Sequence, residues 1–529
     1  MKRFTSIVTV MFFSAAALFA QQAGERHDFR RTVEMMPFLQ SSNPAALSGI
    51  SFGEISFAGV SATKDNGGLI PLESSDDAIR AEVSTESYGR LSDRMAYHGE
   101  LSYSYSSGGN MGGPVLMDPL YNPINFYESS EDNTGRRSRE LYGASGALSY
   151  ALGRRLSAGM AFEYESGDQV KVKDPRFRSK WMDMTVSPGL WLQTDGGWGY
   201  GVSMHYRRTL EQVLGGIYGT TDRQYFIYTD KGNFFGTSEE LSGDYNYLPS
   251  STQRPMSNAF YGLSLQARCE GRGSFYNELK VLYRDGYYGN KSSSTATFFD
   301  FGGIDASYEA ALVLPSGAVT HRMEMTADFE LLSNTENLFR YVTPSGQSTV
   351  VEYYGEEKIS ERILADATLK YDMSSGTTFS IPSLAAGASV TGGYLSNAMT
   401  YYPLYRDHMH ATVSCEAHGK KSLIRNGGAV TLGCQAAFMT GFGTECEDGS
   451  YATSTTSLRS FDNYMHRQFE YDTATRSGAA LSLRYTRFVS ARASAYIELS
   501  DSFTCLLKNP QYLYGRTRNA AVLTVGCSF

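Results

Sequence analysis

Two histidines, His408 and His410, come nearest in this chain to the spacing of a metal site. Residues two apart in a β-strand lie on one face, about 6.6 Å from each other, and two imidazoles at that separation could seat a metal ion. The alternative is that both are ordinary polar side chains that face the interior of the folded protein. We favour this alternative, because His418 is too distant along the strand to join the other two. The sequence therefore predicts no metal site and no cofactor.

Ser51 lies in the pattern Gly49-Ile50-Ser51-Phe52-Gly53, which matches the nucleophile elbow of hydrolases. That elbow requires a turn from a strand into a helix, whereas this pattern lies inside an apparent strand. The glycine-rich run 196–201 also lacks a following helix, whose N-terminus could bind phosphate. We therefore predict no catalytic residues and no enzymatic activity.

The segments that carry these residues alternate between apolar and polar side chains, which is typical of β-strands. Leu156, Met160 and Tyr164 share one face, and Ser157 and Glu163 share the other. Counting such segments predicts roughly 18 strands, within a range of about 14 to 18. Their starts are predicted near residues 50, 79, 95, 138, 156, 182, 197, 258, 274, 296, 318, 359, 386, 405, 428, 478, 490 and 516.

The connections between these strands alternate in length. Short turns are predicted near 91–94, 153–155, 194–197, 270–273, 315–317 and 486–489, and long loops near 107–137, 210–257, 334–357 and 441–477. Bacterial outer-membrane barrels have short turns on the periplasmic side and long loops outside the cell. The pattern therefore predicts that the first strand begins, and the last strand ends, on the periplasmic side.

The two faces of the predicted strands differ in chemistry. One face is apolar, and the other carries charges of both signs. A soluble β-sandwich would bury that charged face in a dry core, where unpaired charge is costly. An all-β transmembrane antiparallel barrel instead turns the charged face to a wet lumen. The residues predicted to line the lumen are Arg139, Glu163, Glu165, Arg207, Arg268, Glu278, Lys280, Arg322, Glu324, Asp328, Arg362, Asp366, Lys370, Arg492 and Glu498.

Both ends of the chain indicate export to the cell outer membrane. Residues 1–20 have a basic start and an apolar run typical of a signal peptide. At the other end, Leu523, Val525, Cys527 and Phe529 are apolar at alternate positions. This pattern resembles the C-terminal assembly signal of bacterial outer-membrane barrels, which implies recognition by the barrel assembly machinery.

Composition agrees with this interpretation and limits the partners. Mean hydropathy is −0.32, and no apolar run after residue 20 reaches the ~18 residues that a membrane helix needs. The formal net charge is −8 without a basic run, which argues against nucleic acid as a partner. We expect outer-membrane lipid around the barrel.

Between the signal peptide and the barrel of residues 50–529, the segment 21–49 ends in Ser-Asn43-Pro44-Ala45-Ala-Leu. An Asn-Pro-Ala motif before the first strand resembles the FadL-like superfamily of outer-membrane fatty-acid transporters and the barrels associated with type IX secretion. An uncharacterised barrel family of Bacteroidota is also similar. The resemblance implies that residues 21–49 form a hatch or plug inside the barrel. The higher strand number and the charged lumen of this chain argue against a lipid substrate.

The six cysteines form no Cys-x-x-Cys pair. Cys446 and Cys505 fall in segments predicted to be loops on the extracellular side, separated by one hairpin. Because extracellular conditions permit disulfides, these two are a possible disulfide.

The function that fits these features is passage or uptake of a solute, as a channel or as a component of an uptake complex. The alternative is a scaffold that transports nothing and binds a secretion or surface-protein partner through its long loops. The further partner expected is accordingly another outer-membrane receptor or a surface protein.

Overall fold

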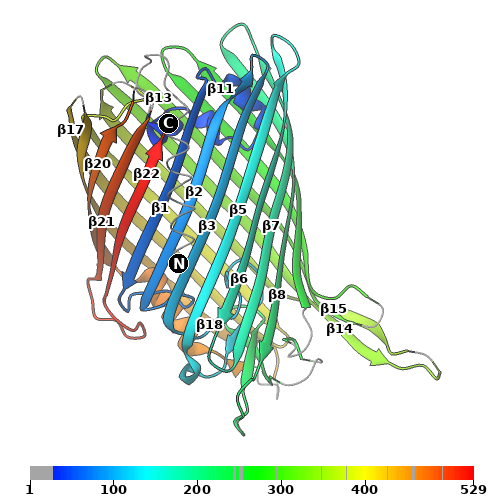
Figure 1. The fold of residues 1–529 in the computed structure, drawn as a ribbon. Helices are drawn as coiled ribbons and strands as arrows, with labels where there is room; N and C mark the ends of the chain where they lie inside the picture. The colour runs from blue at the N-terminus through cyan, green and yellow to red at the C-terminus, as the bar shows by residue number, and fades with distance from the viewer. Residues whose placement is uncertain are drawn as a thin grey trace.

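The computed structural model describes residues 28–529, apart from 221, 242–245, 249–253, 293–294, 347, 377, 426, 454–458 and 491–492. The predicted signal peptide and Arg492 lie outside the described residues. The described chain forms one antiparallel sheet of 18 strands (Figure 1). The strands are β1 (Glu54–Asn66), β2 (Asp77–Ser92), β3 (Met95–Met111), β5 (Gly135–Ala151), β6 (Leu156–Lys171), β7 (Arg176–Gln193), β8 (Trp198–Gly216), β11 (Arg254–Glu270), β12 (Ser274–Gly289), β13 (Thr297–Ser316), β14 (Val319–Val342), β15 (Val350–Ser375), β16 (Leu384–Tyr401), β17 (Leu404–Arg425), β18 (Gly428–Ser450), β20 (Arg476–Phe488), β21 (Ser494–Leu506) and β22 (Thr517–Ser528).

The sheet closes on itself because β1 pairs with β22. Val60 lies opposite Val525 and Ala62 opposite Leu523, so the predicted assembly signal forms one side of the closing seam. Beyond the last strand residue, the Ser56 N–H donates to the Phe529 carbonyl at 2.7 Å. The first strand therefore begins, and the last ends, at the same end of the barrel, which is the upper end in Figure 1. The prediction of a closed barrel of about 18 strands is confirmed.

The outer face of the barrel is apolar. Leu265, Tyr283 and Met204 expose 58%, 58% and 61% of their surface although they lie in mid-strand. In a barrel without a free sheet edge, such a face is solvated by lipid. The protein is thus a β-barrel of the outer membrane. None of the helices in the described part of the chain is long and apolar enough to cross a membrane.

Two of the predicted loops are wrong in part. The segment predicted as a loop at 334–357 is mostly strand, since β14 runs to Val342 and β15 begins at Val350, and this hairpin projects beyond the barrel (Figure 1). Similarly, β18 continues to Ser450. Outside the bilayer both faces of a strand meet water, so the apolar alternation fades while backbone pairing continues.

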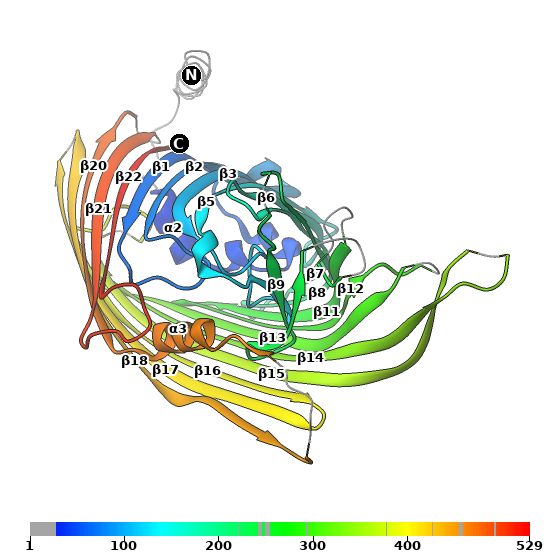
Figure 2. The same cartoon turned by 90° about the horizontal axis from the view of Figure 1, so that it is seen from below.

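Other long loops fold back into the lumen. They form a small sheet of β4 (Asn125–Glu128), β9 (Phe226–Asp230), β10 (Phe235–Glu240) and β19 (Arg459–Ser460), together with α3 (Asp462–Thr473). We call these elements the loop plug. Seen from the loop end, α3 and β9 lie within the ring of strands (Figure 2). The short helix η3 (Glu131–Asn133) follows β4.

Apolar packing seats the loop plug. Phe126, Ile227 and Phe235 share a buried cluster with Phe299 and Met399 of the barrel wall. Buried ion pairs add to it: Glu128 accepts from Arg137 at 2.9 Å and also binds Lys171, and Lys231 pairs with Glu336 at 2.7 Å. The sequence did not predict this plug.

The N-terminal segment occupies the other end of the lumen. It comprises α2 (Phe29–Met35), η1 (Pro37–Gln40) and η2 (Pro44–Gly49), and we call residues 28–50 the hatch. The Asp28 side chain caps α2 by accepting from the Arg31 N–H at 3.0 Å. Phe29, Phe38 and Leu47 are buried in one cluster with Tyr88 and Tyr276 of the wall. The hatch and the loop plug thus face each other across the lumen.

Candidate functional site

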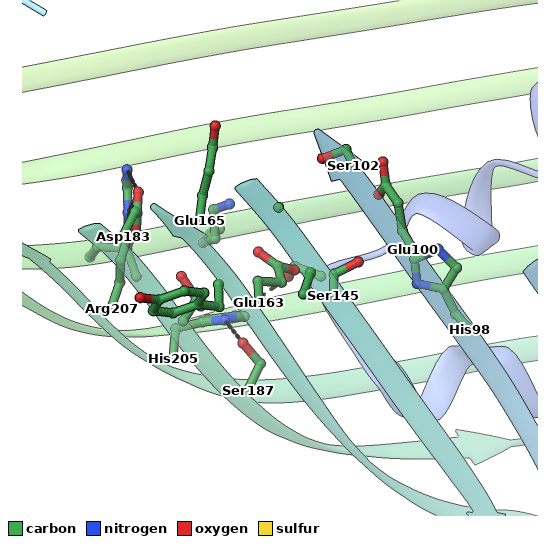
Figure 3. A pocket seen from close by; sticks show the side chains of 17 residues that line it. His98, Glu100, Ser102, Ser145, Glu163, Glu165, Asp183, Ser187, His205 and Arg207 are labelled. Carbon is green, nitrogen blue, oxygen red and sulfur yellow. Dashed lines mark hydrogen bonds and ion pairs between the residues drawn. The ribbon is translucent and has the colours of Figure 1, made fainter. Parts of the chain in front are cut away.

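A polar cavity of about 520 Å³ lies in the lumen (Figure 3). Its wall is formed mainly by β3, β5, β6, β7, β8 and β12, and Ser42 of the hatch also contributes. A second cavity of about 240 Å³ shares Ser42, His98 and Glu163 with the first and extends between the wall and the hatch. The two form one space, which we call the lumen cavity.

Negative charge predominates in the lumen cavity. The larger part is lined by four carboxylates, Glu100, Glu163, Glu165 and Asp183, and by two cationic side chains, Arg207 and Lys280. Asp183 is neutralised, because Arg207 donates to its Oδ2 at 2.6 Å and to its Oδ1 at 3.1 Å. Among the described residues, Glu100, Glu163 and Glu165 have no Arg or Lys in an ion pair. The cavity therefore favours cations over anions.

A network of hydroxyl groups surrounds His205 on one side of the cavity. Its Nδ1 lies 2.8 Å from the Ser187 hydroxyl, and its Nε2 lies 2.8 Å from the Ser264 hydroxyl and 3.1 Å from that of Ser203. A Ser–His catalytic pair normally needs a third group, a carboxylate, to orient the imidazole. Here both ring nitrogens contact serine hydroxyls, so the arrangement does not resemble a triad.

The Asn-Pro-Ala segment borders the smaller part of the cavity through Pro44 and fits against glycines in the wall. Asn43 Nδ2 donates to Gln266 Oε1 at 2.9 Å and to the Leu190 carbonyl at 3.0 Å. A Cβ at Gly189 would lie 2.1 Å from Asn43 Oδ1, so a larger residue there would displace the hatch. Ala45 is fully buried, and its carbonyl accepts from the Ser149 hydroxyl at 3.1 Å.

The residues predicted to line the lumen divide into groups by contact. Glu163, Glu165, Arg207 and Lys280 line the cavity. Others contact the hatch: the Arg268 guanidinium lies 3.7 Å from the centre of the Phe38 ring, Glu278 accepts from the Ser42 N–H at 3.2 Å, and Glu498 pairs with Arg30 at 3.7 Å.

The remaining residues of that prediction lie nearer the loops or on β14 and β15. Arg139 and Arg362 donate to the carbonyls of Met117 and Leu120, which precede β4. On β14 and β15, ion pairs link Arg322, Glu324 and Lys370, and Asp328 lies opposite Asp366.

His408 and His410 lie on the lumen side of β17, against Phe469 of α3. The His408 Nε2 atom is 3.0 Å from His410 Nδ1, and His408 Nδ1 is 2.7 Å from the Glu445 carbonyl. Hydrogen bonds thus occupy three of their four nitrogens. His418 instead pairs with Asp372 at 3.0 Å.

The possible disulfide is wrong. Both Cys446 and Cys505 are free and lie in strands, β18 and β21, rather than in loops. Cys505 lies opposite Ser477, which lies opposite Phe438, eight residues before Cys446. Eight residues of strand span roughly 26 Å, far beyond the ~7 Å between Cα atoms that a disulfide allows. The error arose because strand β18 extends beyond its apolar part.

Glu86, His98 and Glu100 were missed by the sequence analysis. Of the described residues, these three form the one group of His, Cys, Asp or Glu side chains that is close enough to hold a metal ion. The pair His98 and Glu100, two apart in one strand, has the same spacing as His408 and His410. What the sequence could not show is that Glu86 of the preceding strand lies opposite Glu100.

Burial raises the pKa values of two carboxyl groups in the loop plug. Burial raises the pKa of Asp230 to about 7, and the Gly232 N–H at 2.9 Å and nearby Arg406 oppose that shift. Burial also raises the pKa of Asp472 on α3 to about 6. Both residues line a small cavity of about 80 Å³ between the plug and the wall.

Comparison with known proteins gives a family but no activity. The model of a family of unknown function, DUF6850, matches residues 44–529. No curated protein matches the chain. Among solved structures, the ferric preacinetobactin receptor BauA from Acinetobacter baumannii is 8% identical over 90% of this chain and 80% of that one, with a TM-score of 0.38. The ferric enterobactin receptor PfeA from Pseudomonas aeruginosa is 9% identical over 90% of this chain and 81% of that one, with a TM-score of 0.39. A FadL homologue from Pseudomonas aeruginosa is 11% identical over 92% of both chains, with a TM-score of 0.30. Sequence identities and TM-scores this low do not support a function shared between this chain and those proteins.

Proposed function

We propose that this chain, which belongs to the DUF6850 family of unknown function, is a gated conduit that takes up a small polar solute across the outer membrane. The observation that carries the proposal is the lumen cavity, whose larger, acid-rich part of about 520 Å³ is enclosed by the barrel wall and Ser42 of the hatch. A barrel that only anchored a partner would need no such space. The cavity is of the size that holds small ligands in other proteins.

The hatch is a suitable gate because much of its attachment to the wall is polar. Asp28 pairs with Arg484 at 3.3 Å, and Arg31 donates to the Thr378 carbonyl at 3.1 Å. Water can replace such contacts when the segment moves, at a net cost of roughly 0.5–1.5 kcal/mol for each hydrogen bond. The resemblance of the Asn43-Pro44-Ala45 segment to the hatch of FadL-like barrels supports the same role.

The charge of the cavity points to the class of solute. Glu163 and Glu165 are fixed on β6 and have no ion-pair partner among the described residues. In a narrow space with low-dielectric walls, fixed carboxylates raise the local concentration of cations. We therefore assign to the conduit a preference for cationic or neutral polar solutes over anions and fatty acids.

A scaffold is the second candidate, and the projecting β14–β15 hairpin favours it. Its tip lies outside the barrel (Figure 1), and Tyr353 and Tyr354 expose 46% and 66% of their surface. Exposed tyrosines are common in protein interfaces. A lumen closed at both ends would also suit a scaffold.

Conductance in planar bilayers tests the proposal. We expect low conductance for the intact chain, because the hatch and the loop plug each narrow the lumen. We define the opened variant as the chain that lacks residues 24–42 and has 217–253 replaced by a Gly-Ser linker. The opened variant should conduct ions strongly. The deletion of 24–42 alone and the replacement of 217–253 alone should each give a conductance between that of the intact chain and that of the opened variant. If the opened variant is folded and does not conduct, the scaffold becomes the better account.

A further inference from the structure

The wall of the lumen cavity carries a three-residue group whose chemistry differs from its surroundings. Glu86 of β2 lies directly opposite Glu100 of β3, and His98 lies two residues before Glu100 on the same face. One nitrogen and two carboxylate oxygens of these side chains lie within 4.8 Å of one another. The His98 Nε2 atom is 3.2 Å from Glu86 Oε1. Three donor groups thus converge on one point.

The group places two carboxylates opposite each other, with the His98 imidazole beside Glu86. Like charges directly opposite each other on neighbouring strands are destabilising. Along the same row of the wall, Glu100 is followed by Ser145 and then by a further carboxylate, Glu163. Among the described residues, neither Glu86 nor Glu100 has an Arg or Lys in an ion pair. A bound cation would remove the repulsion that the wall otherwise has to sustain.

The histidine is held in position by packing. Its ring stacks on Tyr88, with ring centres 4.3 Å apart and planes inclined by 26°. Tyr88 is 2% exposed, and its ring lies 6.1 Å from that of Phe29 in the hatch. His98 therefore cannot swing freely, and the orientation of a first nitrogen ligand is fixed before any ion arrives.

The surroundings leave room for the rest of a coordination shell. His98 and Glu100 line both parts of the lumen cavity, and Glu86 lines the smaller part. Sites with three protein ligands keep their open positions for water or substrate. One imidazole with two carboxylates suits divalent first-row transition metals, whereas Mg²⁺ and Ca²⁺ prefer oxygen ligands alone.

We propose that Glu86, His98 and Glu100 bind one divalent transition-metal ion, such as Zn²⁺ or Mn²⁺, in the wall of the lumen cavity. Each side chain supplies one ligand atom, and water in the cavity supplies the others. The site does not depend on whether the barrel conducts, because it is built from two neighbouring strands of the wall.

Equilibrium dialysis of the full chain in detergent tests the site. The protein is first stripped with a chelator, then dialysed against Zn²⁺ in the presence of excess Mg²⁺, and the bound metal is quantified by mass spectrometry. We expect one saturable Zn²⁺ site per chain. His98→Gln and Glu100→Gln should each weaken it at least about tenfold, since even loss of a residue that only supports a ligand costs 10–100-fold.

Two variants serve as controls. Glu165→Gln removes a carboxylate of the same cavity outside the group, and His321→Gln removes a histidine whose ring contacts Tyr371 instead. Both should keep the saturable Zn²⁺ site. Glu165→Gln should weaken it far less than His98→Gln does, because it removes only a part of the general attraction of the cavity for cations. Heat-modifiable migration on a gel verifies that each variant is folded, and Glu86→Gln replaces any variant that is not.

Three results would overturn the site. The first is the absence of saturable Zn²⁺ binding by the folded chain. The second is unchanged binding in His98→Gln and Glu100→Gln. The third is equal weakening by Glu165→Gln, which would mean that the whole acidic cavity attracts the ion and that no specific site exists.

Discussion

At the scale of single residues, the polar groups of the lumen fall into two kinds. Some hold parts of the structure together, as Asn43 does with Gln266 and as Glu128 does with Arg137. Others, such as Glu163 and Glu165, face the cavity without an ion-pair partner among the described residues. The sequence showed that many of these residues share a face. It could not separate the two kinds, because the spatial partner of a residue cannot be identified from the sequence, whether that partner is distant in the chain, as Gln266 is from Asn43, or near, as Arg137 is to Glu128.

Asn43→Ala should loosen the hatch. The change removes two hydrogen bonds to the wall and the cap that the Asn43 side chain provides to the Ala45 N–H at 3.0 Å. We expect roughly 1–3 kcal/mol less stable docking, seen as faster hydrogen–deuterium exchange in residues 28–50. Asn509→Ala, on an exposed loop, is the control. Equal exchange in both variants would show that Asn43 does not hold the hatch.

At the scale of elements, the strands were more predictable than the segments that fill the barrel. Most predicted strand starts lie within a few residues of the observed ones, for example 156 against Leu156 and 428 against Gly428. Lipid on one side and water on the other impose an alternation that the sequence must show. The loop plug carries no such periodicity, since β4, β9 and α3 are stabilised by long-range contacts such as that of Phe126 with Tyr288.

The loop plug should loosen as the pH rises. Burial raises the pKa of Asp230 to about 7, so docking favours its protonated form. That stabilisation is fully present below the ordinary pKa of aspartate, about 4, and is lost as the pH rises through 7. Conductance of the chain that lacks residues 24–42 should therefore increase several-fold between pH 5 and pH 8.

Asp230→Asn should remove the part of this pH dependence that lies near pH 7 and leave only the smaller part that Asp472 contributes nearer pH 6. Asp222→Asn, at an exposed position in the same loop, is the matched control and should behave like the parent. If the conductance of Asp230→Asn still increases with pH as much as that of the parent, the pH dependence arises from a group other than Asp230.

At the scale of the whole molecule, closure of the barrel decides whether it can exist in lipid. The seam joins β1 to β22, and the Phe529 N–H donates to the Ser56 carbonyl at 3.0 Å as its last backbone contact. An open seam would leave backbone groups without partners in hydrocarbon, at a cost of several kcal/mol each. The pairing of β1 with β22 therefore closes the barrel and sets its topology.

Deletion of Phe529, or Phe529→Asp, should lower the amount of folded protein in the outer membrane several-fold. The terminal aromatic resembles the signal that the barrel assembly machinery recognises, and it ends the closing strand. The heat-modifiable folded form on a gel measures the effect. Leu507→Asp, on an exposed extracellular loop, should leave the level unchanged. Normal levels without Phe529 would contradict this role.

The central claim is that a wet, cation-favouring path runs through the lumen once the hatch and the loop plug move aside. Solute influx into proteoliposomes tests it most directly, with lysine, glutamine and glutamate as probes of similar size and different charge. In the opened variant, lysine should enter fastest, glutamine more slowly and glutamate slowest. Adding Glu163→Gln and Glu165→Gln to the opened variant should reduce the differences between the influx rates of the three probes. Adding Glu356→Gln, on the projecting hairpin, should leave those differences unchanged. No influx of any probe into liposomes that carry the folded opened variant would contradict the account.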